Sequence, residues 1–378
     1  MIKHGFTKCS VDSCVYRRKE GDNEIVMAVH VDDFTCAVTS QEYWEEFMTE
    51  FTDVKNGGFK ARDEGQPEQV LGGAVSYGDN GEITWSHEMM CEKLFDLVQQ
   101  ATSKTMYTKG SPGVKGKYLS TDDGPEEGEN VEQVKKFPIR EVNGLLCYLA
   151  NTSRPDVAFE VSQTARFNDC PTAMAIAAIV RIAEYLNKTK TRGITWGGDR
   201  AMDQPVTFGD ASHCWEPNKG WGTGGHVVMM YGGAIAWRSK SIKLIVRGTR
   251  DSEAHAMCAA VEAALWAREW LRSFGYLEEA KPSTVYTDSS CLVDGLGDGS
   301  FNSSRRAILI AGLLMRQEIK NGEIEMVHIS GSCNIADILT KSEVPDVHGR
   351  LATAMIGEAR INVLSAGKFG KATANDFK

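Results

Sequence analysis

Residues 205–239, PVTFGDASHCWEPNKGWGTGGHVVMMYGGAIAWRS, decide the fold of this chain. They contain three short apolar runs, PVTFGDAS (205–212), GGHVVMMYG (224–232) and AIAWRS (234–239), separated by glycines and polar residues. Runs of this length and composition, bounded by turn-forming residues, are typical of β-strands. The stretch therefore predicts three consecutive strands.

The sequence that follows alternates between helical and strand patterns. A long helix is expected from Asp251 to Phe274, with an apolar face that has Glu253 at its edge. A strand is expected over TVYTDS (284–289), then helices to about residue 320, a strand over EIEMVHI (323–329) and a short helix near Ile335. The order β-β-β-α-β-α-β-α predicts an α/β domain. The residues of the apolar face of the long helix are Ala254, Met257, Cys258, Val261, Ala264 and Leu265.

Four acidic residues fall at the ends of the expected elements. Asp210 ends the first strand, Glu253 lies in the first turn of the long helix, Asp288 ends the fourth strand, and Asp337 opens the last helix. Because a crevice forms beyond the carboxyl ends of adjacent parallel strands, we expect these side chains to converge. Clustered carboxylates persist when cations neutralise them, which favours a site for two Mg²⁺ ions that hydrolyses a phosphodiester. Taken singly, each acid is better explained as a turn or helix-terminus residue, and only the coincidence of all four with element ends favours the metal site.

This half contains the motifs Asp210-Ala211-Ser212, Trp237-Arg238-Ser239-Lys240, Asp251-Ser252-Glu253-Ala254 with Ala-Ala-Leu-Trp at 263–266, Thr287-Asp288, and Ala336-Asp337-Ile338-Leu339-Thr340-Lys341. Taken together, these five motifs resemble the RNase H domain of copia-type LTR retrotransposon polyproteins. The resemblance implies an α/β, RNase H-like five-stranded mixed sheet with flanking helices. It also implies that Asp210, Glu253, Asp288 and Asp337 are catalytic and bind two Mg²⁺ (or Mn²⁺) ions, and that the substrate is the RNA strand of an RNA·DNA hybrid.

A local run of basic residues lies between Trp237 and Arg250, where no acidic residue occurs. Such a run can hold the phosphates of a nucleic acid even when the whole chain is acidic. A charged, solvated strand edge explains the same pattern equally well. The residues that we predict to bind nucleic acid are Trp237, Ser239, Lys240, Lys243, Arg247 and Arg250.

The amino-terminal half predicts two hairpins, each followed by a helix. The first hairpin is EIVMAVHVDDFTCAV (24–38), with a helix over 41–51, and the second is VLGGAVSY (70–77) with EITWSH (82–87), with a helix over about 88–100. Residues 102–136 are rich in Gly, Pro and charged residues and are expected to form a solvated linker or long loop. Helical spacing returns from Ile139 onward and predicts three helices.

His30-Val31-Asp32-Asp33 resembles the Tyr-x-Asp-Asp motif of reverse transcriptases, and the resemblance implies a partial polymerase site at Asp32 and Asp33. Two adjacent acids in a hairpin are also ordinary turn residues. The family's polymerase uses a further metal-binding Asp upstream, together with the fingers, so we expect this chain not to polymerise DNA alone. Further segments resemble the polymerase and connection regions of the same polyproteins: residues 5–16, Leu71-Gly72, Gly81-Glu82-Ile83 and 152–157.

The expected organisation therefore has five parts. They are a partial reverse transcriptase with palm hairpin and thumb-like region (1–101), a linker or long loop (102–138), a helical connection segment (139–200), the RNase H-like domain (201–341) and a carboxy-terminal extension (342–378).

Composition limits the class of protein. With 42% hydrophobic and 25% charged residues the chain is expected to be globular, and its net charge of -9 excludes nucleic-acid attraction by bulk charge. The ten scattered cysteines lack zinc-site spacing and fit reduced thiols in the cytoplasm or nucleus rather than a secreted protein. No apolar run is long enough for a membrane span, so no membrane partner is expected. A scaffold that binds nucleic acid or another partner without catalysis is the alternative function, and the sequence leaves the oligomeric state open.

Overall fold

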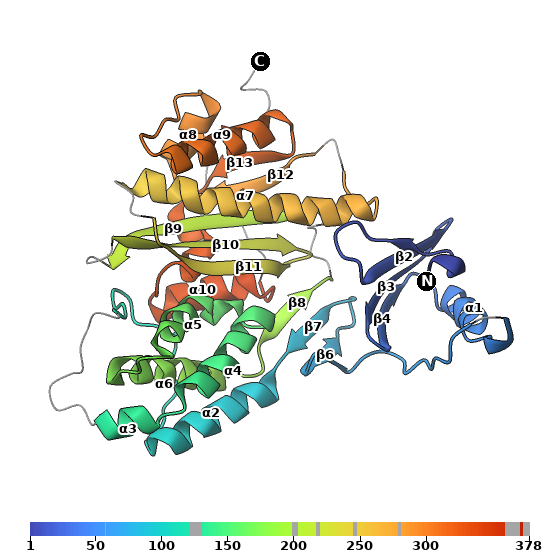
Figure 1. Cartoon of the computed structure of the whole chain (residues 1–378), viewed down its shortest axis with the longest axis horizontal. Helices are drawn as coiled ribbons and strands as arrows, with labels where there is room; N and C mark the ends of the chain where they lie inside the picture. The colour runs from blue at the N-terminus through green and yellow to red at the C-terminus, as the bar shows by residue number, and fades with distance from the viewer. Residues whose placement is uncertain are drawn as a thin grey trace. The chain divides into compact units, whose positions relative to one another are not determined.

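The computed structural model of the chain describes residues 1–56, 58–120, 131–198, 203–216, 220–244, 248–278, 281–359 and 371–372. These residues form two compact units (Figure 1). The first unit comprises Met1–Pro67 and Trp266–Glu278, and the second comprises Glu68–Leu265 and Glu279–Lys378. No described helix is both long enough and apolar enough to cross a membrane.

The first unit is an antiparallel sheet with one helix. Its strand order is β1-β2-β3-β4, and the β3–β4 hairpin and the helix α1 confirm the elements expected over 24–51. Phe47 and Phe51 of α1 pack with Ile25 and Met27 of β3 to form the core of this unit. Its elements are a 3-10 helix at Ile2–His4, β1 (Thr7–Lys8), β2 (Val15–Glu20), β3 (Asn23–His30), β4 (Asp33–Val38), α1 (Gln41–Phe51) and a 3-10 helix at Val54–Asn56.

The second unit begins with a small sheet and a layer of helices. The predicted hairpin over 70–87 is present, and the strand β8 adds to its edge from more than a hundred residues further along the chain. Leu94, Leu146 and Ile182 lie in one buried core, from α2, α4 and α6 respectively. The elements are β5 (Gln69–Val70), β6 (Gly73–Tyr77), β7 (Ile83–Ser86), α2 (Glu88–Thr102), α3 (Val131–Lys136), α4 (Ile139–Thr152), α5 (Ala158–Thr164), α6 (Ala173–Lys188) and β8 (Gly193–Trp196), with 3-10 turns at Pro155–Val157 and Ala165–Phe167.

The boundary between the compact units does not coincide with the expected boundary at 102–138. The division falls at residue 67 because β7 pairs with β8 and α2 packs against α4 and α6, on the far side of the expected linker. Long-range strand pairing of this kind joins segments that the local composition separates.

The described part of the expected linker comprises residues 102–120 and 131–138. Residues 131–136 form the helix α3, and residues 103–120 are held against their neighbours rather than solvated along their length. The Tyr107 backbone N–H donates to Oε1 of the buried Glu184 over 2.6 Å, and Arg181 Nε donates to the Gly113 carbonyl over 2.9 Å. Lys115 pairs with Glu343 at 2.8 Å. These contacts satisfy backbone groups that a free loop would leave to water, and they correct the expectation of a solvated linker for this stretch.

The largest sheet has the order β11-β10-β9-β12-β13-β14. The pairs β11–β10–β9 are antiparallel and β9–β12–β13 are parallel, which confirms the expected RNase H-like five-stranded mixed sheet; the two-residue β14 adds a sixth strand. The helices α7, α8 and α9 pack on the sheet around Val285 and Met326. The elements are β9 (Val206–Glu216), β10 (Trp221–Met230), β11 (Gly233–Ile242), α7 (Thr249–Ser273), β12 (Ser283–Thr287), α8 (Ser290–Gly297), α9 (Arg306–Lys320), β13 (Ile324–His328) and β14 (Lys371–Ala372).

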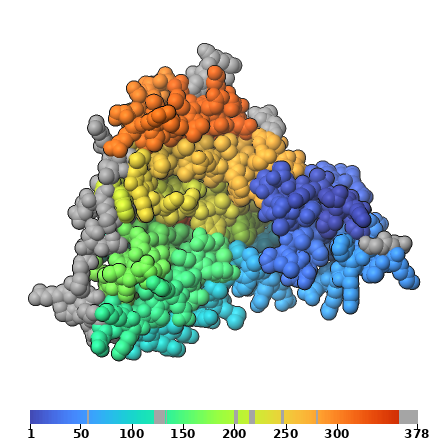
Figure 2. All heavy atoms as spheres, in the orientation of Figure 1, coloured from blue at the N-terminus to red at the C-terminus, as the bar shows by residue number. Residues whose placement is uncertain are grey.

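A second core lies against Phe208 and Val227 of this sheet and contains Ile338 and Leu339 of η6 (Ile335–Leu339). Figure 2 shows the green helical segment packed directly against the yellow strands, and Ser162 of α5 approaches Ser239 of β11 at 3.5 Å between their hydroxyl oxygens. The 3-10 turn Gly331–Cys333 leads into η6.

The stretch after Lys341 is not a peripheral extension over its described part. Residues Pro345–Met355 form α10, and Leu351, Ala352 and Met355 are buried in the core beside η6. Because α10 removes this apolar surface from water, we expect the domain to depend on it for stability. This helix was not predicted, although Val347, Leu351 and Met355 stand at helical spacing after Pro345.

Glu160 on α5 is a buried acid with one weak partner. Ser342 donates a hydrogen bond of 3.1 Å to its Oε1, and its Oε2 is buried without a hydrogen-bond partner in the described structure. Burial raises the pKa of Glu160 to about 8; Asp156 adds to the effect, while Ser342 and Arg181 oppose it. The carboxyl group is therefore protonated in the folded protein at neutral pH.

Glu160→Gln should remove a pH-dependent loss of stability. Because the folded pKa lies above the unfolded value, wild-type stability falls as the pH rises from about 5 to about 8, at up to about 1.4 kcal/mol per pH unit. Urea unfolding across this range should show the variant gaining on the wild type as the pH rises. Glu141→Gln, at an exposed position of α4, is the matched control. A constant difference between Glu160→Gln and wild type would contradict the prediction.

Candidate metal centre

Asp210 lies inside β9 rather than at its end. The strand continues to Glu216 because it stays paired with β10, whereas its parallel pairing with β12 is limited to Thr207 and Phe208. After Phe208, therefore, β9 no longer pairs with β12 on its parallel side. Asp210 is on the same face as Phe208, since side chains two apart in a strand share a face. The strand is longer than the sequence indicated.

Asp288 follows β12 directly, and a buried asparagine holds it. Asn334 Nδ2 donates to the Gly209 carbonyl over 3.0 Å and approaches Oδ1 of Asp288 at 3.4 Å. The same asparagine caps η6, because its Oδ1 accepts from the Ala336 backbone N–H. Asn334 was not predicted as a site residue, although its place immediately before the last expected helix is a capping signal.

η6 carries Asp337, and the two residues that follow η6 also contact the site. Thr340 Oγ1 donates to Oδ2 of Asp210 and to the Asp337 carbonyl. Lys341 Nζ forms an ion pair with Oδ1 of Asp337 at 3.0 Å. Both residues belong to the motif at 336–341, but neither was predicted to contact the acids.

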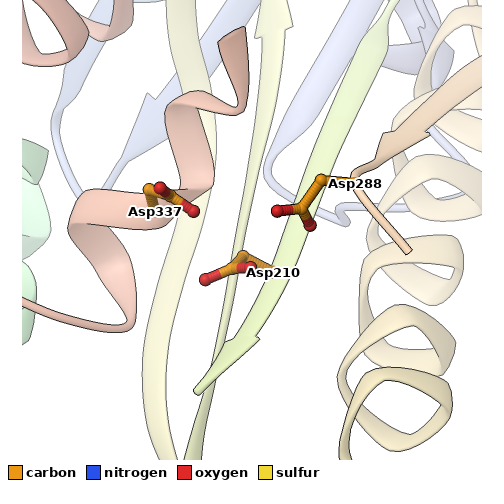
Figure 3. Close-up of side chains that lie close together, drawn as sticks. All are labelled: Asp210, Asp288 and Asp337. Carbon is orange, nitrogen blue, oxygen red and sulfur yellow. The ribbon is translucent and has the colours of Figure 1, made fainter. Parts of the chain in front are cut away.

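The three aspartates converge on one point. One ligand oxygen from each of Asp210, Asp288 and Asp337 can be chosen so that all lie within 4.8 Å of one another. Figure 3 shows these carboxylates pointing toward a common space from β9, from the end of β12 and from η6. Within the described ranges this is the one such group of three or more potential metal ligands. Carboxylate oxygens are the ligands that Mg²⁺ and Mn²⁺ prefer.

Glu253, in the first turns of α7, interacts with the same group. Burial raises the pKa of Glu253 to about 9, and the charges of Asp210 and Asp288 add to the effect. Its Oε2 is buried and has no hydrogen-bond partner among the described residues. Burial likewise raises the pKa of Asp337 to about 7, with Asp210 contributing and Lys341 opposing. Four carboxyl groups in this space resist ionising together, and the all-oxygen donor set fits divalent cations that would relieve that repulsion.

Two glycines let the neighbouring elements approach. A Cβ on Gly209 would lie 2.4 Å from Met257 Sδ of α7, and a Cβ on Gly225 would lie 2.6 Å from Leu339 Cβ of η6. Gly225 is the residue of β10 that pairs with Asp210. Glycine at these positions therefore brings α7 and η6 close to the strand that carries Asp210.

The predicted nucleic-acid residues divide into two groups. Trp237 Nε1 donates to the Ala150 carbonyl of α4 over 2.7 Å, and Ser239 approaches Ser162 of α5, so both contact the helical layer. Lys240, Lys243 and Arg250 are exposed. Lys243 lies over the Trp221 ring at 5.3 Å, and Arg250 donates to the Asn302 carbonyl over 2.7 Å. Arg247 lies outside the described residues.

Asp32 and Asp33 lie at the tip of the β3–β4 hairpin, with Val31 and Asp32 between the paired residues His30 and Asp33. Both acids are exposed, and neither belongs to the group of potential metal ligands found within the described ranges. Val31 has φ of +56°, an unusual conformation for a β-branched residue. The palm and thumb assignment and the polymerase role of Asp32 and Asp33 stay predictions.

Comparison with known proteins gives relatives along most of the chain, although no family model matches it. It is 24% identical over 359 residues to the retrovirus-related Pol polyprotein from transposon TNT 1-94 of Nicotiana tabacum, covering 94% of this chain and 26% of that polyprotein. It is 27% identical over 248 residues to a transposon Ty5-1 protein of Saccharomyces cerevisiae, covering 65% of this chain and 75% of that protein. RNase H1 from Halobacterium salinarum aligns with 36% of this chain and 94% of its own, at 19% identity and a TM-score of 0.28.

The sheet order and its flanking helices define an RNase H-like domain within the second unit. Over most of its length the chain is a relative of the copia-type retrotransposon Pol polyproteins, as the motifs predicted. It spans about a quarter of the length of the tobacco polyprotein.

Proposed function

We propose that this chain hydrolyses the RNA strand of RNA·DNA hybrids at the site formed by Asp210, Glu253, Asp288 and Asp337. The observation that carries the proposal is the convergence of three carboxylates within 4.8 Å on an RNase H-like sheet, with the buried Oε2 of Glu253 left without a partner in the described structure. A binding scaffold alone has no need for such a costly set of buried acids.

The residues of the site would divide into metal ligands and residues that position those ligands. Asp210, Asp288 and Asp337 would hold two Mg²⁺ or Mn²⁺ ions, with Glu253 as a fourth ligand. When bound, such ions activate a water and stabilise the leaving oxygen of an in-line phosphodiester displacement. Asn334 and Thr340 would keep Asp288 and Asp210 in position through the hydrogen bonds described above. The products would be a 3′-hydroxyl and a 5′-phosphate.

The exposed cations of β11 and the residues after it provide a surface for the substrate. Lys240, Lys243 and Arg250 are exposed, and they would contact the phosphates. Selection of RNA over DNA would depend on contacts to the 2′-hydroxyl groups. Trp237 and Ser239, which contact α4 and α5, would support this strand rather than bind the substrate.

The purified chain should cut labelled RNA in an RNA·DNA hybrid when Mg²⁺ or Mn²⁺ is present, and EDTA should stop the reaction. The same RNA in a single strand, and a DNA·DNA duplex of the same sequence, are the matched substrates and should remain intact. Cleavage should weaken steeply between about 50 and 200 mM salt because phosphate binding releases counterions.

Gel analysis of the labelled strand measures the metal dependence, the substrate selectivity and the salt dependence of cleavage. Binding of the hybrid without any cleavage, in either metal, would favour the alternative of a nucleic-acid-binding scaffold without catalysis. Cleavage that persists in EDTA would show that the acidic site is not a metal centre.

A further inference from the structure

Lys341 puts a positive charge into the acidic cluster. Its Nζ is 3.0 Å from Oδ1 of Asp337, and it also interacts electrostatically with Asp210 and Asp288. The side chain keeps 33% of its surface exposed, so it lies at the solvent side of the site. The ammonium is therefore in direct contact with one of the three convergent carboxylates.

The backbone after η6 fixes this position. The Lys341 N–H donates to the Asp337 carbonyl over 3.1 Å, so the two side chains lie one helical turn apart on the same side. The preceding residue, Thr340, donates its hydroxyl proton to Asp210. Thr340 therefore supplies the acidic cluster with a hydrogen bond, and Lys341, the next residue, supplies it with a positive charge.

This arrangement has opposite consequences with and without metal. In the metal-free protein the ammonium offsets the repulsion among the carboxylates. A divalent ion that approaches Asp337 has to compete with the ammonium for Oδ1 and also meets its like charge. The partial exposure gives the lysine side chain a route into solvent when the ion binds.

We propose that Lys341 is a positioning residue that acts as a built-in counter-cation: it holds the aspartates together in the metal-free protein and lowers their affinity for divalent ions. The inference rests on the proposed function, because it takes the cluster to be a metal site. Metal binding by the carboxylates does not itself require a neighbouring cation, so the counter-cation role of Lys341 goes beyond the proposed metal site.

Lys341→Met should change two measurements in opposite directions. Mn²⁺ binding, followed by the loss of the free-ion EPR signal, should become about tenfold tighter because a like charge beside the site is gone. Thermal unfolding in EDTA should occur at a lower temperature, because the carboxylates lose their counter-ion. A residue with only a structural role would not tighten metal binding. Lys341→Arg retains the charge and should restore both values toward those of the wild type.

Lys93→Met is the matched control, since it removes one charge from an exposed position of α2 in the same unit. It should leave Mn²⁺ affinity unchanged. If the wild type binds Mn²⁺ and Lys341→Met binds it no more tightly, the counter-cation role is overturned while the metal site stands. If neither the wild type nor any variant binds Mn²⁺, the proposed function fails and this inference fails with it.

Discussion

On the proposed function, Asp288→Asn should reduce hybrid cleavage by about 100-fold or more, because it removes a charge that would hold the metal ions while leaving the size of the side chain unchanged. Asp288 follows β12 at the open edge of β9, and its carboxylate is one of the three that converge within 4.8 Å. Single-turnover cleavage of a labelled hybrid with saturating Mg²⁺ measures the loss directly.

The same variant should be more stable than the wild type when metal is absent. It removes one of the mutually repelling carboxylates, so its melting temperature in EDTA should rise. This combination of lost activity and gained stability separates a metal ligand from a residue needed for folding. Asp294→Asn, at an exposed position of α8, is the matched control and should change neither value. Cleavage by Asp288→Asn at the wild-type rate would assign the activity to another site or to a contaminating nuclease.

Local patterns in the sequence predicted most of the elements of the RNase H-like domain. The apolar stripe of the long helix is an example: Ala254, Met257, Val261 and Ala264 are buried against the sheet. Such patterns work because the periodicity of a helix or strand determines which side chains share a face. They also predicted the β3–β4 hairpin, since apolar runs on both sides of a polar turn leave few other conformations.

The elements that the sequence did not reveal depend on contacts between distant segments. β8 has only four residues, and its pairing with β7 brings together Trp85 and Ile194. Residues 103–120 are polar and rich in glycine, yet Glu184 and Arg181 of α6 hold them in place. The surfaces against which these segments pack fix their conformations, and the composition of a segment does not reveal those surfaces. For residues 103–120, composition alone therefore predicted a linker.

The candidate site shows the same limit. The coincidence of four acids with element ends indicated Asp210, Glu253, Asp288 and Asp337, and the structure brings three of them together with the fourth in electrostatic contact. The residues that hold these acids in place are harder to predict from the sequence. An asparagine such as Asn334, which hydrogen-bonds to Asp288, cannot be told in sequence from any other helix cap. Trp237 illustrates a contact that the sequence does not reveal: an aromatic residue in a basic stretch predicted nucleic-acid binding, which stays a prediction, and its indole N–H donates to the Ala150 carbonyl.

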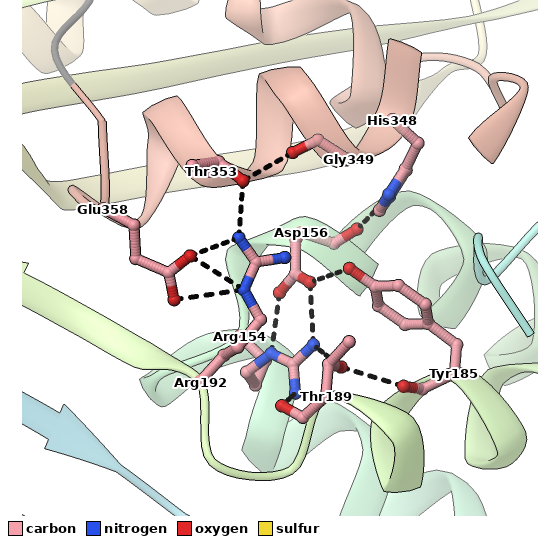
Figure 4. Close-up of polar contacts among 9 residues, drawn as sticks. All are labelled: Arg154, Asp156, Tyr185, Thr189, Arg192, His348, Gly349, Thr353 and Glu358. Atoms are coloured by element: carbon pink, nitrogen blue, oxygen red, sulfur yellow. Dashed lines mark hydrogen bonds and ion pairs between the residues drawn. The ribbon is translucent and has the colours of Figure 1, made fainter. Parts of the chain in front are cut away.

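A buried ion pair at the 3-10 turn Pro155–Val157 contacts α6 and α10 (Figure 4). Arg154 and Asp156 are fully buried, and two hydrogen bonds of 2.9 and 2.8 Å join the guanidinium to the carboxylate. Tyr185 donates to the same carboxylate over 2.7 Å, and His348 contacts the Asp156 carbonyl at 2.9 Å. Burial alone would raise the pKa of Asp156, but the Arg154 guanidinium outweighs it and holds that pKa well below its usual range.

Arg154→Met should destabilise the folded protein by about 3–5 kcal/mol, because it leaves the Asp156 carboxylate buried without a cation. At a typical response of about 2–4 °C per kcal/mol for a domain of about 150–250 residues, the melting temperature should fall by roughly 10 °C. The variant also loses the hydrogen bonds of 2.7 and 3.1 Å that Arg154 donates to the side chain and carbonyl of Thr189 at the end of α6. Differential scanning calorimetry of the full chain measures the change.

The surface pair Arg140–Asp169 is the matched control, since it joins the same chemical groups at 2.7 Å with side chains that are 75% and 90% exposed. Arg140→Met should cost less than about 1 kcal/mol, because exposed charges keep their hydration when the partner is removed. The double variant Arg154→Met/Asp156→Leu should recover much of the stability that Arg154→Met loses, since no uncompensated charge stays buried. Equal losses from the buried and exposed arginines would show that desolvation of Asp156 is not the dominant cost, and that the pair acts mainly through the packing of its side chains.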